Sequence, residues 1–572
     1  MKVADYIINF LADKGVDKIF VVYGAANGDL IDAFTRTDKT EYVCVMHEQA
    51  GGFAAEGYAK ISGRPGVVIA TSGPGGQNLV TPIANCYFDS VPCIFITGQV
   101  PTYVMRKDLD VRQVGFQETD IVSIVSPITK WAGTIHEPYK GIMDHAWNIA
   151  TKGRPGPVLL DVPLDVQKSD ILDSGGGLIV PVVEYSYTVQ HVYDFIEDLS
   201  WAKKPVMLIG NGVRGAVKEF REVADRLKMP CFPTWNALDI VTSDFPWYGG
   251  RVGTYGGAGR NFGIQNCDLL LSVGSRLSGR VTGGSETQME LFAPKAVKYV
   301  VDIDPAYSQQ KTQRIKIEHD IHCDAKLFFQ ILLESIRHVY SFRDWTETVM
   351  DWKKKYDPVK EEFYMQDAVH PYAFMRNLSR IMGKDDVLVG DCGGNLVVLS
   401  HAFETKYGQR ILTNNGNSPM GFSFAAAMGC WFADPKRQVV CTIGDGGFNM
   451  NIQELQTLLN YGIKTKTFIM NNHVYGITKQ FQETNFEGRM EACGPTGYKP
   501  PDFRKIVEAY GVRLFTIDNT SEMRSKIKDV LEYDGPVVCD VDMHDFHTYE
   551  PRISNWEDPI HDMYPHIELE SV

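Results

Sequence analysis

The sequence predicts an α/β protein built of three doubly wound domains, each organised around a parallel sheet. The chain has 572 residues, and at roughly 100–200 residues per domain this length suggests about three domains. Short apolar runs alternate with helical stretches in three separate blocks of the chain. Strands that alternate with helices of about 10–15 residues are typical of βαβ units, in which the strands lie parallel.

The first block covers residues 1–175 and contains the clearest alternation of strand and helix patterns. Each predicted strand is a short run of apolar and β-branched residues, and each predicted helix is longer and mixed in polarity. The strands are expected at 18–24, 41–46, 66–71 and 91–98, and the helices at 27–37, 48–63 and 77–90.

A linker at about 168–188 leads to a second block at about 189–345, and a charged helical connector at 345–364 leads to a third at about 368–545. Both blocks repeat the same pattern. The strands are expected at 205–212, 268–276 and 298–305, and then at 386–391, 411–415, 438–445, 466–472, 513–518 and 536–543. The last stretch, 546–572, is acidic and aromatic without a clear period, which fits a lid, a subunit clamp or a free tail.

Composition excludes several classes of protein. The formal net charge of -14 argues against a nucleic-acid binder, which would carry a basic patch. The 11 cysteines are scattered without a C-x-x-C pair, so neither a disulfide scaffold nor a zinc ribbon is expected, and a reduced cytoplasm is the natural location. The N-terminus lacks the features of a signal peptide. We find no apolar run of about 18 residues and expect no membrane span.

The strongest chemical signal lies in the third block. One predicted strand ends at Asp445, and after a Gly-rich turn and a helix the next strand ends at Asn471 and Asn472. This crossover places Asp445 and Asn472 at the carboxyl ends of two parallel strands, the edge where ligands bind in open α/β sheets. Carboxylate and amide oxygens suit magnesium, and the backbone N–H groups of the turn suit an anion. A plain loop is the alternative interpretation of the Gly-Asp-Gly-Gly segment.

This combination resembles the signature of thiamine-diphosphate enzymes. Within that superfamily the chain is similar to the acetolactate (acetohydroxyacid) synthase group over nearly its whole length, to about residue 545. The resemblance implies a pyrimidine-binding first domain, a central domain of the FAD or nucleotide type, and a diphosphate-binding third domain. It also implies that Asp445 and Asn472 bind magnesium together with the main-chain carbonyl of Val474.

The resemblance assigns further cofactor contacts in the third block. Met420 stands where the family places the apolar wedge that bends the cofactor and brings its reacting groups together; simple core filling is the alternative for a methionine. The residues expected near the diphosphate are Gly394, Asn395, Gly444, Gly446 and Gly447.

The first block resembles the other half of such a site. His47-Glu48-Gln49 resembles the motif that carries the family's catalytic glutamate. A carboxylate bonded to the aminopyrimidine ring favours its imino form, whose exocyclic nitrogen can take the C2 proton, so Glu48 would act through the cofactor. The alternative is that Glu48 only stabilises the start of the helix that follows, where a negative charge is favourable.

Three other segments of the first block match family motifs. The Thr71–Gly76 segment resembles a loop that lines the cofactor pocket, although it is also a plausible tight turn. Phe116 and Gln117 match a Phe-Gln-Glu motif whose first two residues approach the substrate, which makes Gln117 a second catalytic candidate. Further cofactor contacts are expected from Gly24, Ala25, Ala26, Ser72, Gly73 and Asn78. In the family the two half-sites come from different subunits, so a homodimer or homotetramer is implied.

The central block contains the G-x-G-x-x-G pattern at 210–215, which is the dinucleotide fingerprint. The acidic residue that a nicotinamide dehydrogenase needs at the end of the next strand is absent, so that function is disfavoured. The resemblance instead implies a non-redox FAD, and an empty pocket is the alternative. The FAD contacts would be Gly212, Arg276, Asp302 and Asp324.

The sequence departs from the family pattern at three places that shape the acceptor side. Leu164 replaces a lysine, Phe481 replaces a tryptophan, and Ser278-Gly279 replaces two aspartates. A second 2-keto acid would need a cationic clamp for its carboxylate, and the loss of the lysine removes one donor while Arg276 remains. We therefore expect a different acceptor, such as a nucleotide-linked keto sugar.

The expected activity is decarboxylation of a 2-keto acid, most simply pyruvate, and transfer of the two-carbon remnant to an acceptor carbonyl. The alternatives are acetolactate synthase proper, a simple decarboxylase, and a non-catalytic regulatory paralogue. The joint presence of Glu48, Gln117, Asp445 and Asn472 disfavours the last.

Overall fold

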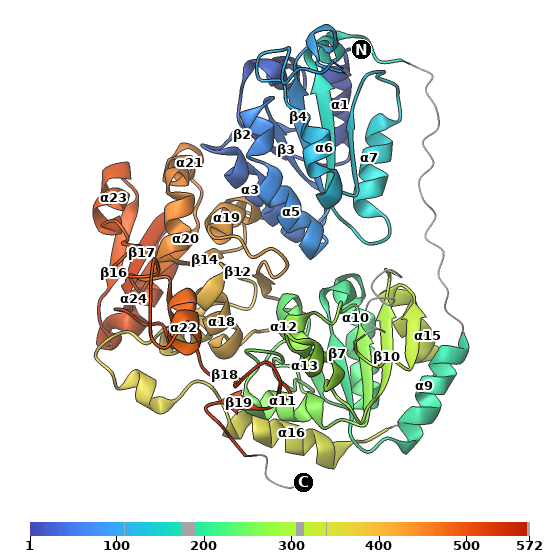
Figure 1. The fold of residues 1–572 in the computed structure, drawn as a ribbon, viewed down its shortest axis with the longest axis vertical. Coiled ribbons are helices and arrows are strands. Elements are labelled where there is room, and N and C mark those ends of the chain that lie inside the picture. Colours follow the sequence, from blue (N-terminus) through green and yellow to red (C-terminus); the bar gives the residue numbers. More distant parts are fainter. Residues whose placement is uncertain (108, 173–188, 305–313, 339, 569–572) are drawn as a thin grey trace.

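The structure is a computed structural model that describes residues 1–107, 109–172, 189–304, 314–338 and 340–568. It contains three bodies, each built around a parallel sheet, and these correspond to the three predicted blocks (Figure 1). The prediction of an α/β protein with three parallel-sheet domains is therefore confirmed. Residues 173–188 of the predicted linker lie outside the described residues.

The first domain has a six-stranded sheet with the order β2-β1-β3-β4-β6-β5, and all its strand pairs are parallel. The strands are β1 (Lys18–Val21), β2 (Glu41–Cys44), β3 (Gly66–Ala70), β4 (Cys93–Gln99), β5 (Trp131–Thr134) and β6 (Val158–Pro163). The helices are α1 (Val3–Asp13), α2 (Gly28–Asp32), α3 (Glu48–Ser62), α4 (Pro74–Gln77), α5 (Val80–Asp89), α6 (Ile121–Val125), α7 (Ile142–Thr151) and α8 (Leu164–Lys168).

The third domain repeats this topology, because its order β13-β12-β14-β15-β17-β16 is the same when the strands are counted from β12. The strands are β12 (Val387–Gly390), β13 (Arg410–Leu412), β14 (Val439–Gly444), β15 (Lys466–Asn471), β16 (Arg513–Ile517) and β17 (Val537–Asp542). The helices are α17 (Pro371–Ile381), α18 (Gly393–Ala402), α19 (Phe422–Ala433), α20 (Asp445–Met450), α21 (Leu455–Tyr461), α22 (Gly476–Asn485), α23 (Phe503–Tyr510) and α24 (Thr520–Glu532).

The central domain has a five-stranded parallel sheet with the order β11-β10-β9-β7-β8. The strands are β7 (Pro205–Ile209), β8 (Cys231–Pro233), β9 (Leu269–Val273), β10 (Val297–Asp302) and β11 (His319–His322). The helices are α9 (Val189–Trp201), α10 (Val217–Leu227), α11 (Ala258–Gln265), α12 (Gly279–Thr282), α13 (Glu286–Glu290), α15 (Ala325–Ser335) and α16 (Arg343–Lys355). Counted from β7, this is the doubly wound order 2-1-3-4-5.

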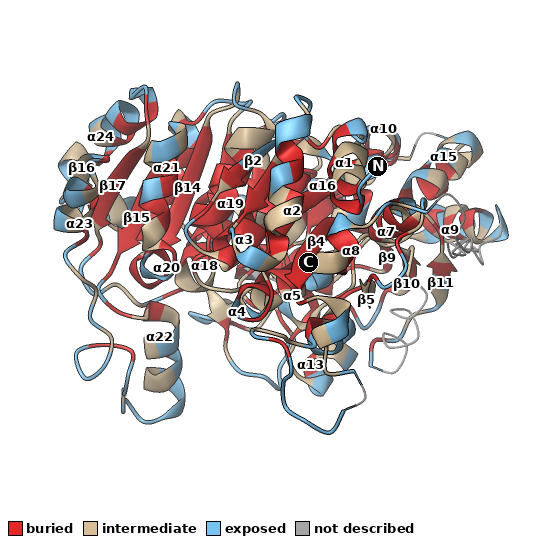
Figure 2. Ribbon diagram, turned by 90° about the horizontal axis from the view of Figure 1, so that it is seen from above, coloured by how far each residue is buried: buried red, intermediate tan, exposed pale blue. Residues whose placement is uncertain are grey.

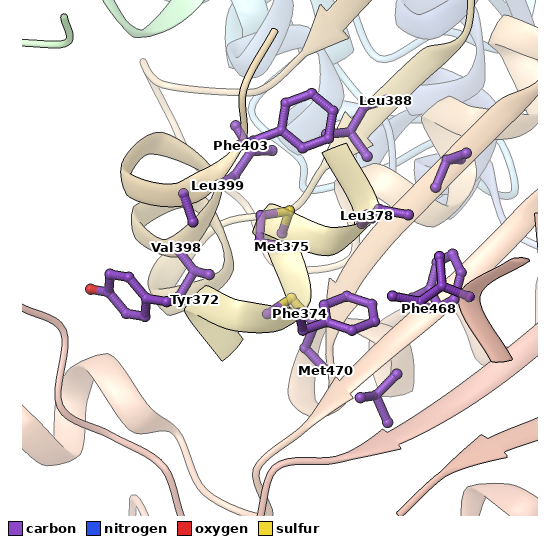
Figure 3. Close-up of a cluster of buried hydrophobic side chains, with 14 of the residues drawn as sticks. Tyr372, Phe374, Met375, Leu378, Leu388, Val398, Leu399, Phe403, Phe468 and Met470 are labelled. Atoms are coloured by element: carbon purple, nitrogen blue, oxygen red, sulfur yellow. The ribbon is translucent and has the colours of Figure 1, made fainter. Parts of the chain in front are cut away.

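The sheets form the cores of the domains, since their central strands are buried while the outer helices keep one exposed face (Figure 2). Parallel strands covered by helices on both faces are apolar along their whole length, which explains runs such as that of β4. In the third domain, Phe374 and Leu378 of α17 and Leu399 of α18 pack with Phe468 of β15 in one apolar cluster (Figure 3).

Two predicted helices are interrupted. The helix expected at 77–90 is divided into α4 and α5, because Pro82 within a continuous helix would lack its N–H and clash with the carbonyl of Asn78. The helix expected at 27–37 is the short α2 followed by a 3-10 turn, where the Thr35 hydroxyl donates to the Asp32 carbonyl at 2.7 Å. Strands β5, β6 and β11 were not among the predicted strands.

The connector and the C-terminal stretch both pack on the central domain. Trp345, Val349 and Trp352 of α16 share a core cluster with Phe262 of α11. The C-terminal stretch forms a small antiparallel pair, β18 (Arg552–Ile553) with β19 (Met563–Tyr564). The Asn261 side chain donates to the Ile560 carbonyl at 2.7 Å, so residues 551–564 are docked rather than free.

The first and third domains meet through α3 and α19, which pack closely in antiparallel directions. A Cβ added to Gly57 would overlap the carbonyl of Ala426, and one added to Gly429 would overlap the carbonyl of Ala54. Glycine at these two crossing points lets the backbones of the helices approach each other.

Among the described residues, none of the helices has the length and apolar character needed to cross a membrane.

Candidate active site

The chain reverses its winding at an equivalent point in all three sheets, between β1 and β3, β7 and β9, and β12 and β14. Ligands bind outside the carboxyl ends of the strands at such a switch point. The loops there are in close contact. A Cβ on Gly24 would lie 2.5 Å from Thr71 Oγ1, one on Gly210 would overlap Gly274, and one on Gly447 would overlap the Asp391 carboxylate.

Glu48 is the first residue of α3 and is 8% exposed. Its Oε2 accepts a hydrogen bond from Asn78 Nδ2 at 2.9 Å, so the structure brings together two residues that were predicted separately. His47 caps the helix, because its Nδ1 accepts from the Gln49 N–H at 3.2 Å. The capping is thus done by His47, which leaves the second oxygen of Glu48 facing Gly75.

Gln117 lies against the same loop. Its φ of +62° is in the left-handed region, which a residue with a Cβ rarely adopts, and a Cβ on Gly73 would lie 2.7 Å from the Gln117 carbonyl. Such strain is found at functional sites. Phe116 beside it is 85% exposed, and Ser72 is buried. Ala25 and Ala26 lie in the 3-10 turn after β1, where the Ala26 carbonyl accepts from Gln167.

Asp445 lies at the carboxyl end of β14 and is 3% exposed. It begins α20 directly, so the Gly-Gly-Phe-Asn segment is helical and the predicted turn is wrong. Its Oδ1 accepts from the Gly446 N–H at 2.8 Å, whereas its Oδ2 has no hydrogen-bond partner among the described residues. Burial raises the pKa of this carboxyl to about 6. A bound cation would satisfy the open oxygen.

Asn472 follows β15 and faces the same edge. Its Nδ2 donates to the Phe546 carbonyl at 2.6 Å, which leaves its amide oxygen to the site, and Val474 is buried two residues later. No cluster of three or more His, Cys, Asp or Glu suited to a metal exists in the described part of the chain. Asp445 and Asn472 lie at the ends of neighbouring strands, and the carboxylate and amide oxygens that they offer are of the kind that magnesium prefers, together with phosphate and water.

Met420 and Asn395 also lie at this edge. A Cβ on Gly446 would lie 2.8 Å from Met420 Cε, so the methionine is packed directly on the Gly-rich segment. The Asn395 side chain is turned inward, since its Oδ1 accepts from the Asp391 N–H at 3.1 Å and its Nδ2 points to Met470 Sδ at 2.9 Å. Asn395 therefore supports the strand end with its side chain, while Gly394 and Gly444 present backbone.

Sequence reasoning missed two buried carboxylates. Asp391 follows β12 and accepts from the N–H groups of Gly421 and Ser423 at 3.1 and 2.9 Å, so it anchors the loop that carries Met420. The position of Asp391 at the end of a predicted strand could have identified it as a candidate site residue. Glu454 accepts from the Met46 N–H at 3.1 Å and so ties the turn before Glu48 to the third domain; no sequence pattern indicates this contact.

A cavity of about 620 Å³ lies where the three domains meet. Its lining includes all four residues that were predicted to bind FAD: Gly212, Arg276, Asp302 and Asp324. Six cationic side chains also line it, namely Lys60, Arg154, Arg214, Arg276, Arg280 and Arg410. The buried Asp239 pairs with Arg214 and Arg410 at 2.7 and 2.9 Å. Three carboxylates, Asp89, Asp302 and Asp324, line the cavity as well, and Lys60 and Arg154 pair with Glu56 and Asp304. The cations of the lining still outnumber its carboxylates, which suits an anionic ligand such as a diphosphate.

The glycines of the G-x-G-x-x-G segment at 210–215 have different roles in the structure. Gly210 and Gly212 pack against the backbone of Gly274, where a Cβ would not fit, and only Gly215 faces open space. Asp324 caps α15 by accepting from the Lys326 N–H at 2.9 Å. The first two glycines are therefore needed for close packing of β7 and β9.

Within one chain, the side chains of Glu48 and Asp445, one from each predicted half-site, have no hydrogen-bond partner in common. The interactions of Glu48 described above are with the first domain, and those of Asp445 are with the third. The antiparallel packing of α3 on α19 directs the start of α3 toward the end of α19, where Phe432 contacts Phe20 with ring centroids 6.0 Å apart. Met420 instead precedes the start of α19. The half-sites thus lie toward opposite ends of this helix pair.

The chain matches three family models, one for each domain. They are the N-terminal thiamine pyrophosphate binding domain of thiamine pyrophosphate enzymes over residues 1–124, their central domain over 192–332, and their C-terminal thiamine pyrophosphate binding domain over 391–541.

Similar proteins are found along nearly the full length of the chain. A probable acetolactate synthase large subunit of Methanocaldococcus jannaschii is 34% identical over 95% of this chain and 92% of its own. The acetolactate synthase large subunit of Lactococcus lactis is 32% identical over 94% and 91%, and the isozyme 2 large subunit of Escherichia coli is 31% identical over 97% of both. The chain therefore belongs to the thiamine pyrophosphate enzyme family and is a thiamine-diphosphate-dependent enzyme similar to acetolactate synthase large subunits.

Proposed function

We propose that this enzyme decarboxylates a 2-keto acid, with pyruvate as the donor, and transfers the two-carbon unit to an acceptor carbonyl. The observation that carries the proposal is the pair of buried carboxylates after β2 and β14, at the carboxyl edges of the sheets in two thiamine pyrophosphate binding domains. Glu48 is held by Asn78, and Asp445 keeps one oxygen without a partner among the described residues. Acid–base work and cation binding need these two different environments.

Glu48 is the proposed acid–base residue. Its position at the start of α3 and its bond from Asn78 orient one carboxylate oxygen, and the other remains for the aminopyrimidine of the cofactor. Thiamine diphosphate, when bound, supplies the electron sink that allows a 2-keto acid to lose carbon dioxide. Gln117, held in its left-handed conformation over Gly73, would orient the substrate with Phe116.

The third domain would hold the charged end of the cofactor. Asp445, Asn472 and the carbonyl of Val474 are the proposed magnesium ligands. The backbone N–H groups near Gly394, Gly444, Gly446 and Gly447 would bind the diphosphate. Met420 would pack against the cofactor as an apolar support. The all-oxygen donor set and the unpartnered Asp445 Oδ2 support this assignment.

The separation of the half-sites supports a homodimer or a homotetramer. Glu48 lies toward one end of the α3–α19 pair and Met420 precedes the other, so a complete site would combine Glu48 of one chain with Asp445 of a second. Most homo-oligomers have closed symmetry, which would generate two such sites per dimer.

We assign the central cavity to FAD in a non-redox role. Its six cations, its four predicted contacts and its volume of about 620 Å³ support an anionic dinucleotide of that kind. The purified protein should release flavin on denaturation, and a protein that is free of flavin after purification and does not bind added FAD would contradict the assignment.

We propose that the acceptor is not a second 2-keto acid but a larger carbonyl compound such as a keto sugar. Leu164 is the first residue of α8, at a position where the family has a lysine. Phe481 on α22 stands where the family has a tryptophan, and it is 53% exposed. Ser278 and Arg276 line the central cavity without the family's two aspartates.

The free state of the cysteines supports action in the cytoplasm.

Carbon-13 NMR of the products from labelled pyruvate, with magnesium, thiamine diphosphate and FAD, tests this proposal. Little acetolactate together with slow release of label as acetaldehyde or acetoin is the expected result, and addition of keto sugars should then divert the label. Rapid accumulation of acetolactate would identify acetolactate synthase proper. Tight cofactor binding without turnover of any 2-keto acid would identify a non-catalytic paralogue. Glu48→Gln is the control variant, and any label that it still releases from pyruvate does not come from the proposed site.

A further inference from the structure

Two helices of the third domain begin beside each other at the cofactor edge. α18 and α22 each have ten residues and start at Gly393 and Gly476. A Cβ on Gly393 would lie 3.5 Å from Ile477 Cγ2, which shows how close the two helix starts are. Their free N–H groups and their dipoles together make this a place where an anion is stabilised.

The side chain of Tyr549 enters this place from the C-terminal stretch. A Cβ on Gly394 or on Gly476 would overlap its hydroxyl oxygen, so the hydroxyl lies between the first turns of both helices. Glycine at both positions makes the room that the phenol occupies. The ring is held by Phe546, with centroids 5.4 Å apart and planes at 85°.

The side chain of Tyr549 is buried, because only 5% of the residue is exposed. Its hydroxyl forms no hydrogen bond with another described residue, so it is available to donate to a ligand. Burial raises the pKa of Tyr549 above its ordinary value, so the phenol is protonated near neutral pH and can donate. A neutral donor directed at two helix starts is suited to a phosphate oxygen.

We propose that the Tyr549 hydroxyl donates a hydrogen bond to the diphosphate of the bound cofactor, and so makes the C-terminal stretch a part of the diphosphate site. This rests on thiamine diphosphate binding at this edge. The neighbouring Phe546 carbonyl accepts from Asn472, and residues 551–564 dock on the central domain, so the same short segment joins the metal site, the diphosphate and the central domain.

The test is the affinity for two ligands, measured by titration calorimetry in the presence of magnesium and without any 2-keto acid. Tyr549→Phe should raise the Kd of thiamine diphosphate roughly 10- to 100-fold, because a hydrogen bond to a charged group is lost. It should raise the Kd of inorganic pyrophosphate by a similar factor. Tyr564→Phe is the matched control, since it removes an exposed phenol from the same segment, and both Kd values should stay within about twofold.

Unchanged Kd values in Tyr549→Phe would overturn the inference. A change for thiamine diphosphate without one for pyrophosphate would also overturn it, because the effect would then come from packing against the rest of the cofactor. Failure of the proposed carboligation would leave these binding ratios intact, so the two failures are distinguishable.

A second measurement on the unmodified chain guards against misfolding of the variant. Addition of magnesium and pyrophosphate should slow hydrogen exchange of the amides at 546–550, because the bound anion fixes the tyrosine and the segment around it. Exchange in this segment that does not respond to the anion would contradict the proposal.

Discussion

Glu454 offers the sharpest test of how the first and third domains are joined. Its side chain is fully buried, and both carboxylate oxygens accept from the Met46 N–H, at 3.1 and 3.2 Å. The Thr457 hydroxyl donates to the same carboxylate at 2.6 Å. Burial raises the pKa of Glu454 from 4.5 to about 7, since these hydrogen bonds only partly replace the lost hydration.

The expected effect on stability follows from this shift. The folded state holds the proton more tightly than the unfolded state, so the contribution of Glu454 is full below about pH 4.5. It is lost as the pH rises toward 7 and is constant above that. At about 1.4 kcal/mol per pKa unit, the loss in the free energy of unfolding is about 3 kcal/mol.

Glu454→Gln removes the titrating group and keeps an oxygen that can accept from Met46. The free energy of unfolding in urea, measured from pH 5 to pH 8, should therefore fall less steeply in the variant, by about 2.5 kcal/mol across this range. The exposed Glu557→Gln is the control and should keep the slope of the unmodified protein. Parallel curves for Glu454→Gln and the unmodified protein would refute the reasoning that burial dominates this carboxyl.

Three further predictions concern the site and the helix pair. Glu48→Gln should preserve the contact with Asn78 but slow exchange of the cofactor C2 proton by roughly 100- to 10,000-fold, measured by proton NMR; exchange at the normal rate would remove Glu48 from its role. Asp445→Asn should weaken magnesium-dependent binding of thiamine diphosphate at least about tenfold in calorimetry, and an unchanged affinity would show that the cation lies elsewhere. Gly57→Ala should lower the free energy of unfolding by about 1–3 kcal/mol in urea, because a Cβ meets the Ala426 carbonyl, whereas Gly215→Ala, which faces open space, should change it by less than about 0.5 kcal/mol.

The positions of several candidate residues in the fold were predictable because these residues follow strands. Gly24, Glu48 and Asp445 each come just after a strong apolar run, and parallel strands bring their carboxyl ends to one edge whatever the details of packing. The bond between Glu48 and Asn78 was not predictable, since it depends on the break between α4 and α5 that Pro82 imposes.

Other contacts join segments that are far apart in the chain. The bond from Met46 to Glu454 spans 408 residues, and Tyr549 reaches two glycines from a stretch without periodicity. A local pattern cannot reveal such contacts, because hydrophobic periodicity reports which face of an element is buried and not what lies against it.

The sequence alone therefore determined the three parallel-sheet domains and the placement of the candidate residues at the ends of their strands, because strand period, helix period and turn residues are local properties. Only the tertiary structure decided how the parts are combined. It placed six cations around one cavity, set the antiparallel crossing of α3 and α19 through Gly57 and Gly429, and inserted Tyr549 between the starts of α18 and α22. These arrangements depend on shape complementarity between distant surfaces, in which a single added Cβ changes the outcome.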